Sequence, residues 1–108
     1  MSKDIKQASV DKAEIIGEVF NLYRVFYNQK SNIDVAIKYI RERLDQKESI
    51  IFYIEDGDKC LGFTQLYPTF DSVNVRKKIV LYDLFVREEY RKKRTCKIID
   101  ECCQRLWY

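Results

Sequence analysis

The amino-acid sequence predicts an α+β domain in which a mainly antiparallel four-stranded sheet is combined with three helices. Apolar residues recur every three or four positions in two N-terminal segments and again near the C-terminal end, as in amphipathic helices. Between these segments, apolar and β-branched residues form short runs separated by turn residues, as in strands. We therefore expect one domain, residues 1–108, with the order strand, helix, helix, strand, strand, strand, helix.

The N-terminal part predicts a short strand and a first helix. Ile5–Ala8 has the composition of a strand, and Asp11 followed by Glu14 predicts a helix start with a capping side chain. The helix is expected to end near Asn28. Its predicted apolar face consists of Ile15, Ile16, Val19, Phe20, Tyr23, Phe26 and Tyr27.

Two further segments have helical spacing. Ser31 or Asn32 is expected to cap the second helix. Its inner face is predicted to hold Ile33, Ala36, Ile37, Ile40 and Leu44. The third helix is expected from about Lys92 to Trp107, with Ile98, Ile99, Cys102, Cys103 and Leu106 on its inner face.

The middle of the chain predicts a β-hairpin and a long strand. Ile50–Ile54 leads into the tight-turn pair Asp56-Gly57, and Leu61–Tyr67 is the expected return strand. Pro68 is expected to end that strand because proline cannot donate to a ladder. After a loop over Thr69–Arg76, the long strand is predicted at Lys78–Val86.

Strict alternation would divide this long strand into two faces. One face would carry Ile79, Leu81, Asp83 and Phe85, and the other Val80, Tyr82, Leu84 and Val86. Because both sets are largely apolar, we expect both faces to be covered.

Composition narrows the classes of function. Hydrophobic residues make up 46% of the chain and charged residues 34%, as in an ordinary globular protein. No run approaches the roughly 18 apolar residues of a membrane span, and the polar N-terminus does not resemble a signal peptide. We therefore expect a cytoplasmic protein with no membrane partner.

The cysteine and histidine content excludes several chemistries. The four cysteines have no C-x-x-C pair, which favours reduced cytosolic thiols over disulfides, and we expect no metal site. With no histidine, the chain cannot form a Ser-His or Cys-His nucleophile pair. A general base would have to be Asp, Glu, Tyr, Cys or Lys, or a water held by one of them.

The strongest local charge signal follows the long strand. The segment 87–97 contains only two acidic residues, Glu88 and Glu89, and six basic ones. The basic residues are Arg87, Arg91, Lys92, Lys93, Arg94 and Lys97. Positive charge at a helix start is unfavourable unless an anion lies nearby, and the free N–H groups of a helix start bind phosphate well. The segment predicts either a site for a phosphate-bearing ligand or a solvated charge run.

Several stretches resemble the GNAT family of N-acetyltransferases. The sequence at 81–86, LYDLFV, resembles the family's fourth strand, and Arg91 matches the first position of its phosphate loop, Arg/Gln-x-x-Gly-x-Gly/Ala. The sequences YRVFY at 23–27 and GFTQLYP at 62–68 also resemble one subgroup. The resemblance implies the acyl-CoA N-acyltransferase fold, with acetyl-CoA as the cofactor.

Two departures from the family pattern bear on activity. The two glycine positions of the phosphate loop hold Arg94 and Cys96, so we expect weakened binding of acetyl-CoA, since glycine lets phosphate approach bare backbone. The chain also stops at Tyr108, before the family's fifth strand, so we expect an incomplete, truncated GNAT-like domain.

The resemblance implies a set of site residues. Asp83 matches the position of a carboxylate that helps to deprotonate the amine; alternatively, it is a buried aspartate that caps loop amides. Tyr27 and Gln65 are candidates for the amine pocket, or else packing residues. The implied cofactor-binding residues are Leu84, Phe85, Val86, Arg91, Lys92, Lys93, Arg94, Thr95 and Cys96.

Three functions are therefore open. The first is an acetyl-CoA-dependent N-acetyltransferase acting on a small-molecule or peptide amine. The second is a non-catalytic remnant of the fold that serves as an interaction or regulatory module. A nucleic-acid-binding function ranks lowest because the basic segment is short and has no aromatic platform, so we expect no nucleic-acid partner. The exposed fourth strand or the C-terminal helix is expected to mediate a homodimer.

Overall fold

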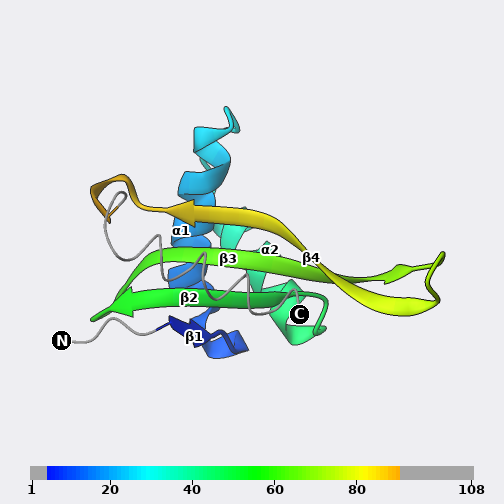
Figure 1. Ribbon diagram of the computed structural model, residues 1–108. Helices are drawn as coiled ribbons and strands as arrows, with labels where there is room; N and C mark the ends of the chain where they lie inside the picture. The colour runs from blue at the N-terminus through cyan, green and yellow to red at the C-terminus, as the bar shows by residue number, and fades with distance from the viewer. Residues whose placement is uncertain (1–4, 91–108) are drawn as a thin grey trace.

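A computed structural model describes residues 5–90 as a four-stranded antiparallel sheet with two helices against one face (Figure 1). The strands lie in the order β1-β2-β3-β4. The elements are β1 (Ile5–Gln7), the 3-10 turn η1 (Val10–Lys12), α1 (Ala13–Phe26), α2 (Ile33–Asp45), β2 (Ile50–Asp56), β3 (Lys59–Asp71), β4 (Arg76–Val86) and the 3-10 turn η2 (Glu88–Tyr90). The predicted α+β architecture is confirmed, while the third predicted helix lies outside the described residues.

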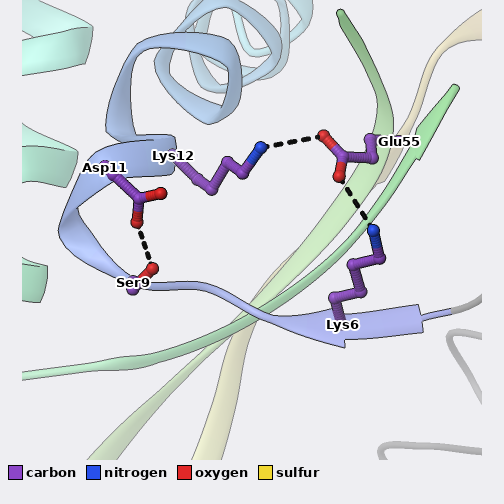
Figure 2. Close-up of polar contacts among 5 residues, drawn as sticks. All are labelled: Lys6, Ser9, Asp11, Lys12 and Glu55. Carbon is purple, nitrogen blue, oxygen red and sulfur yellow. Dashed lines mark hydrogen bonds and ion pairs between the residues drawn. The ribbon is translucent and has the colours of Figure 1, made fainter. Parts of the chain in front are cut away.

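The start of α1 differs from the prediction. Asp11 does not cap the helix; its carboxylate accepts a hydrogen bond from the hydroxyl of Ser9, the residue before η1 (Figure 2). The first N–H groups are instead satisfied by backbone carbonyls, because Lys12 N donates to Ser9 O and Ala13 N donates to Val10 O. A 3-10 turn therefore replaces the side-chain cap.

The two helices are joined tightly at the start of α2. Of the two predicted caps, Ser31 and Asn32, the structure has Asn32 as the N-cap of α2. Its side chain accepts a hydrogen bond from Val35 N at 3.2 Å. The buried Asn21 of α1 also accepts from Asn32 N at 2.9 Å and donates to Ser31 Oγ at 3.0 Å. These bonds fix the direction in which the chain enters α2.

The main core lies between the helices and the sheet. It joins apolar side chains from α1 and α2 to the helix-facing residues of β2 and β3. Its buried members are Ala13, Ile16, Val19, Phe20, Ala36, Ile40, Ile51, Tyr53, Cys60 and Phe63. Three predicted inner-face residues are exposed: Phe26 and Tyr27 are each 60% exposed, and Ile33 is 44% exposed.

The β3–β4 hairpin extends beyond the other strands (Figure 1). Pro68 does not end β3, which continues to Asp71, so that prediction is wrong. The reason is positional: β2 begins at Ile50 opposite Leu66, so beyond that point β3 is paired only with β4. Proline is tolerated there because the missing N–H can face the side without a partner strand.

A β-bulge in β4 breaks the predicted alternation of faces. Gln65 pairs with Asp83 and Leu66 with Leu81, so Tyr82 is the extra residue. Leu81 consequently packs with Leu84 and Val86 in a second cluster on the opposite face, which also contains Ile5, Ile54, Leu61 and Tyr90. Phe85 packs against the main core. The bulge thus separates Leu81 from Asp83 and Phe85, with which it was predicted to share a face.

Glu55, at the end of β2, is held by two lysines from the N-terminal segment. Lys6 Nζ of β1 lies 3.0 Å from its Oε1, and Lys12 Nζ of η1 lies 3.4 Å from its Oε2 (Figure 2). These contacts, the hydrogen bond from Lys6 above all, lower the pKa of Glu55. Among residues 5–90, no helix is long and apolar enough to cross a membrane.

Candidate active site

Asp83 of β4 is the centre of a polar cluster between the sheet and α1. Its Oδ1 accepts a hydrogen bond from the Tyr23 hydroxyl at 2.8 Å, and its Oδ2 accepts one from Gln65 Nε2 at 2.9 Å. Its backbone carbonyl accepts from Thr64 Oγ1 at 3.0 Å. The side chain is partly buried, and its bonds go to side chains rather than to loop amides. The arrangement therefore differs from that of an aspartate that caps a loop.

The position of Asp83 follows from the bulge at Tyr82. Gln65 and Asp83 are register partners immediately beside the shift, so their side chains leave the sheet on the same face. Tyr23 reaches this point from the last turns of α1, where its ring packs edge-on against Phe63 at 5.8 Å and Phe85 at 5.8 Å. Three elements thus meet at one carboxylate.

Gln65 lies below the surface of this cluster. Its side chain is 0% exposed, and its Oε1 has no hydrogen-bond partner among residues 5–90. A fully buried amide cannot touch a bound amine without movement of its neighbours. The structure thus places Gln65, a predicted pocket residue, where it orients Asp83.

The Tyr23 hydroxyl remains protonated over the ordinary pH range. Burial, followed by the hydrogen bond to Asp83 and the charge of that carboxylate, raises the pKa of Tyr23 well above its usual value. Tyr23 is therefore a lasting hydrogen-bond donor to Asp83 and no candidate for the base. The helical spacing predicts Tyr23 on the apolar face of α1 and gives no role to its hydroxyl. A tyrosine in such a position still needs a hydrogen-bond partner for that hydroxyl, and this need is the signal that points to a polar contact.

Other tyrosines surround the cluster. The hydroxyls of Tyr39 (α2) and Tyr67 (β3) lie 2.8 Å apart, and burial together with this bond raises the pKa of Tyr67. The exposed Tyr82 packs on Tyr67 with ring centroids 5.1 Å apart. Tyr27, a predicted pocket residue, is 60% exposed and its ring lies 5.1 Å from that of Tyr23. The partly buried carboxylate is thus bordered by aromatic surface that can attract a cationic amine.

The end of β4 is occupied with packing. The side chains of Leu84 and Val86 belong to the second cluster, and Phe85 packs against Tyr23. Contacts of this stretch with a thioester would therefore have to come from its backbone groups. The other predicted cofactor residues, Arg91, Lys92, Lys93, Arg94, Thr95 and Cys96, lie outside the described residues.

Arg87 has a structural role at the entrance to the basic segment. Its Nε donates to Cys60 O at 2.7 Å, and its backbone N–H donates to Leu61 O at 2.9 Å. The arginine therefore ties the end of β4 to β3. Within residues 5–90, no group of three or more His, Cys, Asp or Glu side chains is placed to hold a metal ion.

The sequence matches a known family over most of its length. A family model described as the Acetyltransferase (GNAT) family matches residues 16–99. The fold and the position of Asp83 on the fourth strand agree with this match. The chain belongs to the GNAT acetyltransferase family.

Individual relatives agree with the family assignment. The chain is 42% identical over 90 residues to the uncharacterized N-acetyltransferase YhfO of Bacillus subtilis, covering 83% of this chain and 60% of that protein. It is 29% identical over 76 residues to a probable acetyltransferase of Haemophilus influenzae, covering 69% of this chain and 52% of that one. The chain therefore spans between about half and three-fifths of the length of these relatives.

A solved structure confirms the fold. The crystal structure of a probable acetyltransferase superposes with a TM-score of 0.85 at 31% sequence identity, covering 95% of this chain and 70% of that chain. The predicted GNAT-like fold is thus confirmed.

Proposed function

We propose that this chain is part of an acetyl-CoA-dependent N-acetyltransferase that acts on a small-molecule or peptide amine. The observation that carries the proposal is Asp83, held by Tyr23 and Gln65 on the fourth strand of a GNAT fold. The carboxylate is partly buried yet forms no ion pair with residues 5–90. Its charge is therefore not offset by a lysine or arginine of the described residues.

The proposed reaction assigns Asp83 the role of proton acceptor. Acetyl-CoA supplies the activated acetyl group as a thioester. The ammonium form of the amine would first lose one proton, which Asp83 accepts directly or through one water. When the neutral amine forms the nitrogen–carbon bond and the carbon–sulfur bond breaks, the second proton of the nitrogen would pass to the leaving coenzyme A thiolate. The exposed Tyr27 and Tyr82 pack on Tyr23 and Tyr67, and they would contact the cationic form of the amine before it is deprotonated.

Binding of the cofactor is assigned to the fourth strand and the loop that follows. The backbone of Leu84, Phe85 and Val86 and the segment from Arg91 to Cys96 are the proposed contacts, by the family resemblance. Arg94 and Cys96 stand where the family has glycine or alanine. We expect these side chains to restrict the approach of the pyrophosphate and to weaken binding.

The same two residues favour a second candidate function. If Arg94 blocks the loop completely, the chain is a non-catalytic member of the family that serves as an interaction or regulatory module. The two functions differ in one measurable property, which is affinity for coenzyme A.

Calorimetric titration with acetyl-CoA, followed by an acetylation assay over a panel of amines, tests the proposal. Micromolar binding with transfer to at least one amine is the expected result for the enzyme. Absence of binding at millimolar ligand supports the non-catalytic module. The double substitution Arg94→Gly/Cys96→Gly is expected to tighten binding at least ten-fold; unchanged affinity would show that these residues are not what limits it.

We also propose that the chain forms a homodimer, through β4 or the C-terminal segment, in the cytoplasm. Among the described strands, β4 pairs only with β3. Leu22 and Val25 of α1 expose apolar side chains beside the end of β4, where they line a hollow together with Phe26, Phe85, Arg87, Glu88 and Glu89. Light scattering coupled to size-exclusion chromatography is expected to give twice the mass of one chain, and a monodisperse monomer at high concentration would refute the dimer.

A further inference from the structure

The two side chains that hold Asp83 share a chemical property. A tyrosine hydroxyl can donate or accept a hydrogen bond, and a glutamine amide has a donor at one end and an acceptor at the other. In this structure both act as donors, Tyr23 to Oδ1 and Gln65 to Oδ2. This pattern is the one that an ionised carboxylate requires, because it can only accept.

The amide oxygen of Gln65 shows that this amide orientation depends on Asp83. Gln65 Oε1 is buried and has no partner among residues 5–90, although unsatisfied buried acceptors are rare and unfavourable. The opposite amide orientation would place Oε1 against the Asp83 carboxylate, oxygen against oxygen. The amide orientation is therefore tied to the ionised form of Asp83.

Protonation of Asp83 changes the hydrogen-bond partner that its Oδ2 requires from a donor to an acceptor. Once Oδ2 carries a proton it becomes a donor, and a half-turn of the terminal Gln65 torsion presents Oε1 to accept from it. Tyr23 can continue to donate to Oδ1, which remains a carbonyl oxygen. Neither change requires the backbone of β3 or β4 to move.

Glu55 shows the contrasting arrangement in the same molecule. Its two oxygens are held by Lys6 and Lys12, which are cationic and can only donate (Figure 2). Such partners stabilise one protonation state alone, and accordingly they lower the pKa of Glu55. No lysine or arginine in the described part of the chain forms an ion pair with Asp83.

We propose that Tyr23 and Gln65 are positioning residues that hold Asp83 in one rotamer in both of its protonation states, with Gln65 reversing its amide when Asp83 takes up a proton. The inference rests on the proposed function only for the source of that proton. In the transfer, the proton leaves the amine nitrogen for Oδ2, and Asp83 later returns it to solvent.

The groups that face this carboxylate come from each element packed around it. Tyr23 approaches from α1 and Gln65 from β3. Tyr67 of β3 lies near enough for the charge of Asp83 to contribute to its raised pKa, and it is bonded in turn to Tyr39 of α2. Arg43 of α2 acts on Tyr67 in the opposite direction. Of these groups, Tyr23 and Tyr67 have raised pKa values and stay neutral, and Arg43 is a cation that forms no ion pair with Asp83.

Nuclear magnetic resonance on the full chain tests the proposal without any activity assay. The Asp83 carboxyl carbon and the Gln65 side-chain amide are followed from neutral to acidic pH. We expect the Gln65 amide signals to change with the same midpoint as the Asp83 carbon. A Gln65 amide that does not respond while Asp83 titrates would overturn the reversal.

Two variants test the positioning role. Gln65→Met keeps the size of the side chain but removes its donor, and Tyr23→Phe removes only a hydroxyl. Tyr23→Phe is expected to raise the midpoint of the Asp83 titration by about one pH unit, a ten-fold gain in proton affinity, because its hydrogen bond is stronger to the ionised carboxylate than to the protonated one. Gln65→Met removes a partner from both states, so its shift should be smaller than that of Tyr23→Phe. Lys6→Met is the matched control and should leave that midpoint unchanged. An unmoved midpoint in folded Tyr23→Phe, or a shift in Gln65→Met as large as that in Tyr23→Phe, would contradict the proposal; if Gln65→Met does not fold, Tyr23→Phe alone decides.

Activity separates this inference from the proposed function. If acetylation occurs, the acid limb of kcat/KM should shift with the titration midpoint in both variants. If no amine is acetylated at any pH while the resonance results hold, the proposed reaction fails and the two-state support of Asp83 stands. If the enzyme is active but neither variant moves the titration, the two-state support fails and the proposed reaction stands.

Discussion

At the scale of single residues, the behaviour of Asp83 depends on the partners of its carboxylate. Asp83 and Glu55 are both partly buried carboxylates, on strands that lie on either side of β3. Glu55 has two cationic partners, whereas Asp83 has two neutral ones. The charge of Glu55 is offset by two ion pairs, whereas the charge of Asp83 is offset by none among residues 5–90, and this difference separates a structural carboxylate from a candidate base.

Replacement of Asp83 by asparagine tests the proposed base. Asp83→Asn keeps the shape of the side chain and one acceptor oxygen but cannot accept the proton, so kcat should fall by about 10²- to 10⁴-fold. Steady-state acetylation kinetics provide the measurement, with Glu55→Gln as a control expected to keep kcat within about three-fold. Full activity in Asp83→Asn would exclude Asp83 as the base.

Val75, at the tip of the β3–β4 hairpin, has a strained backbone conformation. Its φ of 51° lies in the left-handed region, which β-branched residues disfavour and asparagine tolerates. Val75→Asn should therefore stabilise the chain by about 0.5 to 1 kcal/mol, measured by urea unfolding. Val73→Asn, at a neighbouring exposed position without a positive φ, should have almost no effect; equal effects of the two changes would rule out strain as the cause.

At the scale of elements, a β-bulge and a close packing of two helices form the candidate site. The bulge at Tyr82 brings Asp83 and Phe85 to the helix-facing side, and the close packing of α1 on α2 brings Tyr23 and Tyr39 over the sheet. The sequence predicted the strands on either side of the bulge but not the bulge itself. Nothing in the letters LYDLFV distinguishes an alternating strand from one with an extra residue, because both are rich in apolar side chains.

Gly17 permits the close packing of the two helices. A Cβ added there would lie 2.6 Å from Ile37 Cγ1 and 2.7 Å from Ile37 Cα, and the second atom belongs to backbone that cannot move cheaply. Gly17→Ala should destabilise the chain by about 1 to 3 kcal/mol in spite of the better helix propensity of alanine.

Glu18→Ala, at an exposed position of the same helix, is the matched control for Gly17→Ala. The free energy of unfolding is measured in urea for both variants and for the parent chain. Glu18→Ala is expected to change the free energy of unfolding by at most about 0.5 kcal/mol. A stabilised Gly17→Ala variant would mean that α2 can shift away from α1 without cost.

At the scale of the whole molecule, acid should weaken the described fold. The pKa of Glu55 is lowered by its lysine partners, and those of Asp11, Asp71 and Glu89 are lowered by their local hydrogen bonds. A lowered folded-state pKa adds stability that is present above the unfolded value and is lost as pH falls through the folded value.

Thermal unfolding from pH 7 to pH 3 measures this dependence. The melting temperature should decrease once the pH falls below about 4.5, the ordinary pKa of glutamate, and Glu55→Gln should make that decrease smaller. A pH dependence unchanged by Glu55→Gln would show that its lysine contacts do not persist in solution.

Cys60 reports on cooperative opening of the molecule. Its side chain is fully buried, and burial raises the pKa of its thiol to about 12. Alkylation of Cys60, located by peptide mass spectrometry, should therefore be negligible in native buffer and rise with the unfolded fraction in urea. Rapid labelling of Cys60 in native buffer would mean that β3 opens locally.

The sequence alone determined the architecture of this protein. Periodicity and turn residues gave the two helices, the Asp56-Gly57 hairpin and the long fourth strand, because these signals depend on neighbours along the chain. The resemblance to the family motif also predicted Asp83 as a site residue. The tertiary structure decided what Asp83 touches: the bulge that orients it, the continuation of β3 through Pro68, and the partners Tyr23 and Gln65, which lie 60 and 18 residues away in sequence. Such contacts join residues with no local relation, so they exist only once the sheet and helices have packed.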